Sequence, residues 1–233
     1  MSKTIVLSPF NRVEGDLQIK VDIQDGRIAD ARAAGIMFRG FEKILKGHFP
    51  DEALVFTPRI CGLCSISHSI ACSNALAAIS EPFTPSNSGQ LAKNICHATE
   101  NAMSHLTHFY LYFAPDLVNK KYEKCKQQPL VVERMAHLKG RSTQTILRER
   151  KHFLEILGII VGKWPHTLAI HPGGVTKSLD SSDVIRIRGI LAQFTAVVES
   201  TTIGMPVEDY LRIKSVADFQ AAFPENHASQ SDL

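Results

Sequence analysis

The longest regular pattern in this chain lies between residues 84 and 116, and it constrains the fold more than any other feature. Its sequence, TPSNSGQLAKNICHATENAMSHLTHFYLYFAPD, has apolar residues at three- and four-residue steps, as on one face of an α-helix. The expected inner face consists of Leu91, Ile95, Ala98, Ala102, Leu106, Phe109 and Phe113. A Ser/Asn start and Pro115 predict where the helix begins and ends. A helix this long with one apolar face predicts a helical bundle.

Two more segments have helical patterns on either side of the chain's middle. Residues 68–79, HSIACSNALAAI, are rich in small side chains, so a helix there can pack close to a neighbour or a cofactor. Ile146–Val161 predicts a longer helix, which Gly162 and Pro165 stop.

A last helix is predicted within residues 181–200, SSDVIRIRGILAQFTAVVES. Ser181 or Ser182 is the expected N-cap, because a serine hydroxyl can accept an N–H bond of the first turn. The expected inner face consists of Val184, Ile187, Leu191, Phe194 and Val198.

The N-terminal residues 3–35 have a different period and predict strands. Apolar residues alternate with polar ones at Leu17, Ile19, Val21 and Ile23, as in a half-buried strand. Asp25-Gly26 is a strong hairpin signal, and a second strand is predicted from Ile28 onward. A short helix is expected around Phe41 to Leu45.

Together these patterns predict an α+β fold, in which a small N-terminal antiparallel sheet is followed by a bundle of long helices. Residues 1–57 are expected to form a β-rich region with a short helix. Residues 58–233 are expected to form the bundle, as one structural unit that is incomplete at its C-terminal end. The last ten residues, PENHASQSDL, are polar and are expected to fray.

Composition excludes several classes of protein. The chain has 233 residues, 44% of them hydrophobic, and a formal net charge of +3 without a long basic run, so nothing indicates a nucleic-acid partner. It has no stretch of eighteen apolar residues and no signal-peptide core, so neither a membrane span nor secretion is expected. Five cysteines are an odd number for a disulfide framework, and they favour a reducing, cytoplasmic compartment or a metal-binding role.

The sequence PRICGLCSISHS, residues 58–69, places two thiols and an imidazole close together. Cys61 and Cys64 are separated by two residues, so both sulfurs can bind one metal ion, and Gly62 lets the loop between them turn tightly. Thiolates favour zinc, iron–sulfur clusters or other thiophilic metals over magnesium and calcium. His68 can be a third ligand or can donate a hydrogen bond to a bound sulfur. Arg59 brings a positive charge that offsets the charge of thiolates.

Other functions of this loop remain open on spacing alone. A structural zinc site normally needs a second cysteine pair, and none follows. A thioredoxin-like redox pair would also place two thiols at the start of a helix. The other cysteines, Cys72, Cys96 and Cys125, are isolated in the sequence. Cys72 and Cys96 lie on apolar helix faces, where a cysteine usually acts as a small hydrophobic residue.

Five stretches, taken in order, resemble nickel–iron hydrogenase large subunits. RICGLCSISH resembles the family's N-terminal metal motif, R-x-C-G-x-C-x-x-x-H, and NRVEGDLQI and FRGFEKIL resemble two segments before it. SHLTHFYLYFAPD and WPHTLAIHPGGVTK resemble the long central helix and a later Gly-Gly-Val loop. The resemblance covers most of residues 4–178 and is strongest to the cytoplasmic uptake and hydrogen-sensing branch.

The resemblance implies a role for each residue around the cysteines. Cys61 is similar to a terminal thiolate on nickel, and Cys64 to a thiolate that bridges nickel and iron. His68 is similar to the residue that donates a hydrogen bond to the bridging sulfur. Arg59 is similar to a charge that lines the site.

Two acidic residues before the cysteines also match the family. Glu14 is similar to the carboxylate that relays protons away from the metals, where burial would raise its pKa; the alternative is an ordinary ion pair with Arg12. Glu42 is similar to a ligand of a remote magnesium ion, and a solvated surface glutamate is the alternative.

The histidines carry weaker implications. His105 and His108 match the family's pattern, yet a histidine on a helix face is more often a core or interface residue. His166 matches a position that faces the partner subunit's nearest iron–sulfur cluster, whereas His171 departs from the pattern. The others, interpreted as ordinary, are His48, His97, His137, His152 and His227.

One part of the family's site is absent from this sequence. The family holds nickel and a CN- and CO-ligated iron with four thiolates, and the second pair belongs to a motif D-P-C-x-x-C-x-x-H that does not occur here. Three situations would each explain this: the large subunit is split, the chain is a fragment, or the chain has lost catalysis. We expect the first, with a second chain that supplies the missing pair and a small subunit that carries the iron–sulfur clusters.

The resemblance therefore predicts the N-terminal part of a hydrogenase that cleaves H2 heterolytically once other chains complete it. A low-turnover hydrogen-sensing module of the same family and a zinc-stabilised interaction domain are the alternatives. A fourth possibility is the subunit of respiratory complex I that has a related fold. That subunit lacks the cysteine pair, so the sequence CGLC argues against it. A cytoplasmic location is expected, with membrane association or export on a partner's signal as the alternatives.

Overall fold

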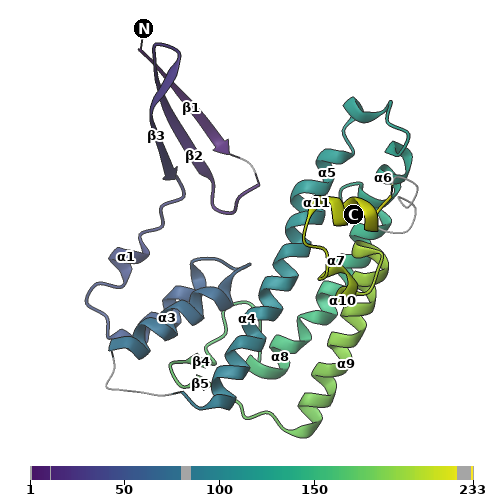
Figure 1. Cartoon of the computed structure of the whole chain (residues 1–233). Coiled ribbons are helices and arrows are strands. Elements are labelled where there is room, and N and C mark those ends of the chain that lie inside the picture. Colours follow the sequence, from purple (N-terminus) through teal and green to yellow (C-terminus); the bar gives the residue numbers. More distant parts are fainter. Residues whose placement is uncertain (1, 11, 80–84, 225–231, 233) are drawn as a thin grey trace. The chain divides into compact units, whose positions relative to one another are not determined.

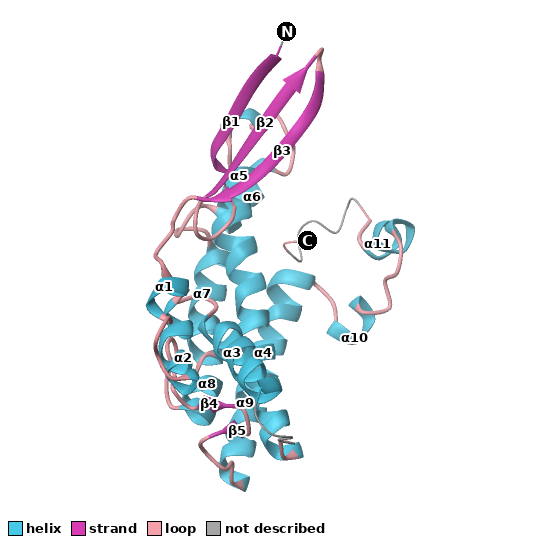
Figure 2. Ribbon diagram, turned by 90° about the vertical axis from the view of Figure 1, so that its left-hand side faces the viewer, coloured by secondary structure: helices cyan, strands magenta, loops and turns pink. Residues whose placement is uncertain are grey.

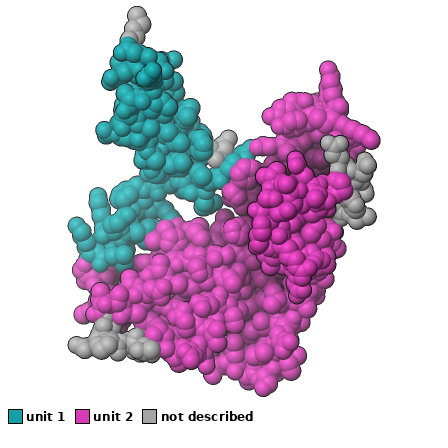
Figure 3. Space-filling view, in the orientation of Figure 1, with its two compact units in different colours: residues 1–46 teal, residues 47–233 magenta. Residues whose placement is uncertain are grey.

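A computed structural model describes residues 2–10, 12–79, 85–224 and 232 of the chain. The chain divides into two compact units, residues 1–46 and 47–233, which Figure 3 colours separately. The domain boundary predicted at residue 57 stays a prediction.

The first unit is a three-stranded antiparallel sheet of strand order β1-β2-β3, followed by a short helix (Figure 1). The strands are β1 (Ser2–Phe10), β2 (Leu17–Gln24) and β3 (Arg27–Gly35), and α1 spans Phe41–Ile44. Asp25 and Gly26 join β2 to β3 with φ values of 49° and 76°, as a two-residue hairpin turn with both φ angles positive requires. The strands, the hairpin and the short helix predicted from the sequence are confirmed.

The second unit is helical, and Figures 1 and 2 show its elements. The helices are α2 (Ala53–Phe56), α3 (Ser65–Ile79), α4 (Asn87–Thr107), α5 (Ala114–Leu117), α6 (Gln128–Met135), α7 (Arg141–Phe153), α8 (Glu155–Val161), α9 (Ser181–Val197), α10 (Val207–Tyr210) and α11 (Val216–Ala222). A small hairpin of β4 (Ile170–His171) and β5 (Gly174–Val175) lies beside the start of α4. The predicted α+β fold with a helical bundle is confirmed.

The core of the second unit lies where α4, α7, α8 and α9 meet. Helix α4 packs against α3, α7 and α8, and α9 packs against α7 and α8 (Figure 1). Leu157 and Ile160 of α8 are fully buried at the centre of this cluster. Phe153 and Phe194 stack with ring centroids 3.8 Å apart, which joins α7 to α9. The core of this unit is therefore built mainly from side chains of different helices.

The sequence predicted that Pro115 ends the long central helix, but the helix continues past it. Helix α4 passes into a π-helical segment, His108–Phe113, and α5 continues from Ala114 to Leu117. Pro115 lies in the first turn of α5, where its missing N–H would have had no partner within that helix. Pro115 thus lies inside a continuous helical run, two residues after the π-helical segment.

The predicted inner face of α4 is also wrong in part. Leu91 is 61% exposed and Phe113 45% exposed, whereas the buried face includes Lys93, Glu100 and Met103. The polar members of this face are buried because they bond to other segments. Ala102 and Leu106 do pack against the core as predicted, so apolar periodicity alone found only part of the buried face.

The other helices differ from their predictions in detail. The helix predicted at 146–161 is two helices, α7 and α8, joined at Leu154, and Gly162 ends α8 with φ 78°. Asp180, rather than a serine, caps α9 by accepting the N–H of Asp183, because its side chain reaches the first turn from outside the helix. Phe194 is buried as predicted, but Val184 and Leu191 are exposed.

Most of the tail predicted to fray, residues 225–231 and 233, lies outside the described residues. Within the described part of the chain, no helix combines the length and the apolar character that crossing a bilayer requires.

Candidate metal centre

The two cysteines of the predicted motif lie on one short loop. Residues 57–59 form a 3₁₀ turn, Cys61–Cys64 follow, and α3 begins at Ser65. Both thiols are half-buried, and all five cysteines of the chain are free of disulfides. The N–H of His68 donates to the carbonyl oxygen of Cys64 at 3.2 Å, so the second cysteine leads directly into the helix.

Gly62 needs neither a special backbone nor extra space. It does not adopt a left-handed φ, and an added Cβ would meet only Cε1 of His166, at 4.0 Å. The sequence interpretation that glycine permits the tight turn is therefore not supported. The contact does place His166 beside the cysteine loop, although it is 104 residues away from Gly62 in the sequence, at position 166 against 62.

A carboxylate from α4 holds the first turn of α3. Glu100 is 1% exposed, and its oxygens accept the backbone N–H groups of Ile66 and Ser67, both at 2.8 Å. The same carboxylate accepts the hydroxyl of Ser67 at 2.8 Å and the indole N–H of Trp164 at 3.0 Å. One buried carboxylate therefore accepts four hydrogen bonds, three of them from the helical turn that follows the cysteine loop.

The loop around Trp164 and His166 contacts the other side of the cysteine loop. His166 Nδ1 lies 2.9 Å from the carbonyl oxygen of Pro58, and His166 has a φ of 62°, which few residues other than glycine adopt. The guanidinium of Arg150 lies 5.3 Å from the centroid of the Trp164 ring, and its Nε donates to Thr107 Oγ1 at 3.0 Å. Burial lowers the pKa of Arg150.

Two further titratable groups lie on the buried face of α4. Burial raises the pKa of the Cys96 thiol to about 12, and the charge of Glu100 adds to this effect. Cys96 is fully buried in the hydrophobic core, as predicted for a small hydrophobic residue. Lys93 donates to Ser73 Oγ at 2.8 Å and Asn74 Oδ1 at 3.0 Å, and burial lowers its pKa.

The structure places the remaining predicted site residues as follows. Arg59 is exposed, and its guanidinium contacts the carbonyl oxygen of Val55. His68 is half-buried, one helical turn after Cys64. Glu14 is exposed in the β1–β2 loop, and Glu42 is exposed in the first turn of α1. The expected burial of Glu14 is therefore not provided by the described residues.

The donor atoms at the cysteine loop fit part of a thiophilic metal centre. Two half-buried thiols lie on one loop, and the hydroxyl oxygen of Ser65, next to Cys64, is buried without a hydrogen-bond partner. Such an orphaned group is unusual and fits a site that receives a further polar ligand. Within the described residues, no three His, Cys, Asp or Glu side chains gather closely enough to hold a metal ion together. The described part of the chain therefore has two thiols on one loop, but it does not form a complete metal site by itself.

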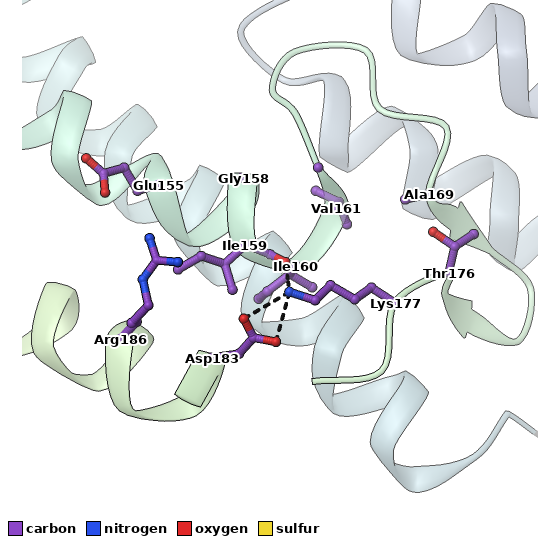
Figure 4. Close-up of a pocket in the computed structure, with 11 residues that line it drawn as sticks. Glu155, Gly158, Ile159, Ile160, Val161, Ala169, Thr176, Lys177, Asp183 and Arg186 are labelled. Carbon is purple, nitrogen blue, oxygen red and sulfur yellow. Dashed lines mark hydrogen bonds and ion pairs between the residues drawn. The ribbon is translucent and has the colours of Figure 1, made fainter. Parts of the chain in front are cut away.

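Two cavities of the second unit are lined by residues outside this loop. One of about 540 Å³ lies between α8 and the start of α9, where Lys177 Nζ contacts Asp183 Oδ2 at 2.8 Å and the carbonyl oxygen of Ile159 at 3.1 Å (Figure 4). Another, also of about 540 Å³, is lined by Leu91 and Ile95 of α4 and by residues 173 and 175–179. Neither cavity includes a cysteine among its lining residues.

Sequence reasoning missed Glu100 and Trp164. Glu100 follows Cys96 by four residues and precedes Met103 by three, so the three share one helix face. A correct assignment of the buried face would have shown an acidic residue within it, and a buried acid needs partners. Trp164 was within a recognised motif, but nothing in the motif connects its indole to α4.

Comparison with known proteins places this loop in a family. Residues 39–144 match the family model described as nickel-dependent hydrogenase. The chain is 30% identical over 189 residues to the large subunit of a periplasmic NiFeSe hydrogenase from Desulfomicrobium baculatum, covering 74% of this chain and 36% of that protein. It is 31% identical over 179 residues to one subunit of the F420-non-reducing hydrogenase of Methanothermobacter marburgensis, covering 76% of this chain and 37% of that protein.

Solved structures agree with these relatives. A NiFeSe hydrogenase from D. vulgaris Hildenborough matches 85% of this chain and 42% of its own with 28% identity and a TM-score of 0.66. This chain therefore spans well under half of the length of the proteins it matches. On these matches of sequence and fold, the chain belongs to the nickel-dependent hydrogenase family and corresponds to a region of its large subunit.

Proposed function

We propose that this chain supplies two of the four cysteine ligands of a nickel–iron centre, through Cys61 and Cys64. The observation that carries the proposal is their shared, half-buried loop at the start of α3, within the residues that match the family model. The orphaned hydroxyl of Ser65 beside them supports it. A bound nickel–iron centre of this kind supplies heterolytic cleavage of dihydrogen to protons and electrons.

Each residue near the loop has a proposed task. Cys61 would bind nickel, and Cys64 would bridge nickel and iron. His68, one turn along α3, would donate a hydrogen bond to the bridging sulfur, which orients the thiolate. Arg59 would offset the negative charge of the thiolates with its own fixed charge.

The first unit would contribute two carboxylates. Glu14 would take up protons and pass them to solvent, to which its exposed side chain already has access. Glu42 would bind a magnesium ion, since hard divalent cations favour carboxylate oxygens. Both roles are carried by the sequence resemblance.

Completion of the site requires other polypeptide. We propose a second chain with the motif D-P-C-x-x-C-x-x-H for the missing thiolates, and a small subunit whose iron–sulfur clusters accept the electrons. The relatives are more than twice as long as the matched region, which is consistent with a missing part. We propose a cytoplasmic location and a reversible hydrogenase; one similar protein is named as periplasmic.

The test is metal analysis and activity of the assembly purified through this chain. Nickel and iron should copurify with it, and turnover of H2 with an artificial electron acceptor should be fast. Cys61→Ser and Cys64→Ser should each abolish both, because a hydroxyl binds these metals far less well than a thiolate. Cys125→Ser is the matched control, since Cys125 is exposed and lies far from the motif in the sequence, and it should change neither.

Two results would contradict the proposal. Zinc alone in the assembly, without nickel or iron, would indicate a structural metal site. Nickel retained in both motif variants would show that the metal lies elsewhere.

A further inference from the structure

The first turn of any α-helix has N–H groups without partners inside the helix. In α3, which begins at Ser65, the second and third of these belong to Ile66 and Ser67. A side chain at the N-cap, position 64, would ordinarily accept them. Here the carboxylate of Glu100 accepts both at 2.8 Å. The cap of α3 is thus supplied by a different helix, and the N-cap position itself carries a cysteine.

The same carboxylate connects the cysteine loop to a second loop. Its bond from the Trp164 indole fixes a residue that is two positions before His166. His166 in turn contacts Pro58, just before the cysteines. A chain of contacts therefore runs from Pro58 through residues 164–166 and Glu100 to Ile66. Cys61 and Cys64 lie in the sequence between Pro58 and Ile66, the two residues that this chain of contacts connects.

Because the Glu100 carboxylate is buried, breaking its hydrogen bonds would cost considerable free energy. Glu100 is 1% exposed, so its charge has little help from water and depends on its four donors. Charge-assisted hydrogen bonds are the stronger ones, and several on one carboxylate fix both its own position and that of its donors. An apolar contact could fill the same space, but it would not fix the direction of the first turn.

From these contacts we propose that Glu100 is a positioning residue for the cysteine pair. Its carboxylate sets the first turn of α3, and with it the place of Cys64, and it couples that turn to the loop of Trp164 and His166. The inference rests on the proposed function, because the positions of the two thiols matter only if they bind a metal. Mutation of a group that hydrogen-bonds to a metal ligand and orients it typically lowers metal affinity by about 10- to 100-fold.

The test uses the whole chain and nickel ions alone. Ni²⁺ binding is followed by thiolate-to-nickel charge-transfer absorbance at a temperature where circular dichroism shows each variant folded. Glu100→Gln should weaken Ni²⁺ binding about tenfold or more, because the amide nitrogen now faces a donor that the carboxylate accepted. Ser67→Ala removes one of the four bonds and should weaken binding less. Glu133→Gln, at an exposed glutamate, is the matched control and should bind as the unmodified chain does.

Hydrogen exchange gives a second readout without metal. The amides of Ile66 and Ser67 should exchange about tenfold faster in Glu100→Gln, since each loses a charge-assisted acceptor, and they should be unchanged in Glu133→Gln. If Glu100→Gln does not fold, Ser67→Ala carries both measurements.

The outcomes separate this inference from the proposed function. Unaltered Ni²⁺ affinity and unaltered exchange in a folded Glu100→Gln chain would overturn the inference, and a purely structural role would lower the melting temperature without changing Ni²⁺ affinity. Ni²⁺ binding that persists in the double variant Cys61→Ser/Cys64→Ser would instead overturn the proposed function, and the exchange rates would still decide the role of Glu100.

Discussion

The two units of this chain are built in opposite ways. No described residue between positions 2 and 46 is buried, and the apolar residues of β2 are only half-buried. In the second unit, Leu157, Ile160, Cys96 and Ile66 are fully buried in one core. The sheet is therefore held mainly by its own backbone pairing and its turn, whereas the helical unit is held by contacts between distant segments.

This difference indicates which unit can hold the two thiols in fixed positions. A three-stranded sheet without a core of its own is only marginally stable. A loop that must present two sulfurs within a fraction of an ångström needs support from a packed interior. The cysteine loop has that support, since α3 contributes Ile66 to the core and receives Glu100 from α4.

The largest expected effect comes from removing part of the core of the second unit. Leu157→Ala should lower the free energy of unfolding by about 2–5 kcal/mol, because Leu157 is 0% exposed and the truncation leaves a cavity. Urea denaturation followed by far-ultraviolet circular dichroism measures this. Ile28→Ala in β3, where the side chain is 68% exposed, is the control from the first unit and should change stability by only about 0.5 kcal/mol.

Comparable losses in the two variants would break the comparison. They would mean that Ile28 is covered in solution by something outside this chain, or that the core of the second unit relaxes around the missing methyl groups.

The same contrast explains what could be predicted from the sequence. The strands and the hairpin were predictable, because alternation at positions 17–23 and Asp25-Gly26 are local signals that no tertiary contact overrides. The helices were also predictable as elements. Their buried faces were not, because Lys93 and Glu100 are buried through bonds to distant segments, which apolar periodicity along one helix does not reveal.

The candidate site divides in the same way. Cys61, Cys64 and His68 were found because their spacing and their motif are local. Glu100 and Trp164 were missed because their importance arises only when α4 and the loop after α8 pack against the start of α3. The pairing of residue 166 with Pro58 across 108 positions likewise has no signature in either segment.

A smaller effect should appear when pH is raised, and it too distinguishes the packed unit. The pKa of the Cys96 thiol is about 12 in the folded chain against an ordinary value of 9.0, so the folded state holds this proton more tightly. The stabilisation is complete below pH 9 and is lost progressively as pH rises from about 9 to about 12. Between pH 8 and pH 10 the loss should be on the order of 1 kcal/mol.

The variant Cys96→Ala isolates this contribution. It should be less stable at pH 8, because it leaves a small cavity, but it should lose less stability between pH 8 and pH 10 than the unmodified chain. Urea denaturation at each pH, under reducing conditions, gives both values. Burial also raises the pKa of Tyr110, but its ordinary value of 10.0 confines that effect to higher pH. Cys125→Ala, at an exposed thiol, should keep the unmodified pH dependence; identical slopes in all three chains would contradict the assignment.

The smallest expected effect concerns the first unit and tests whether its structure depends on the turn. Gly26→Ala should cost about 1 kcal/mol, because φ at Gly26 is 76° and a Cβ is strained in that left-handed conformation. Nothing lies within 4 Å of an added Cβ, so the loss is one of backbone conformation alone. Gly26→Asn is the matched variant and should cost less, since asparagine tolerates positive φ. Hydrogen exchange should quicken in β2 and β3 of the alanine variant while the amides of α8 keep their rates. If the alanine and asparagine variants exchange alike, the sheet is not limited by its turn, and stabilisation of the first unit must come from packing that is absent from its own described residues.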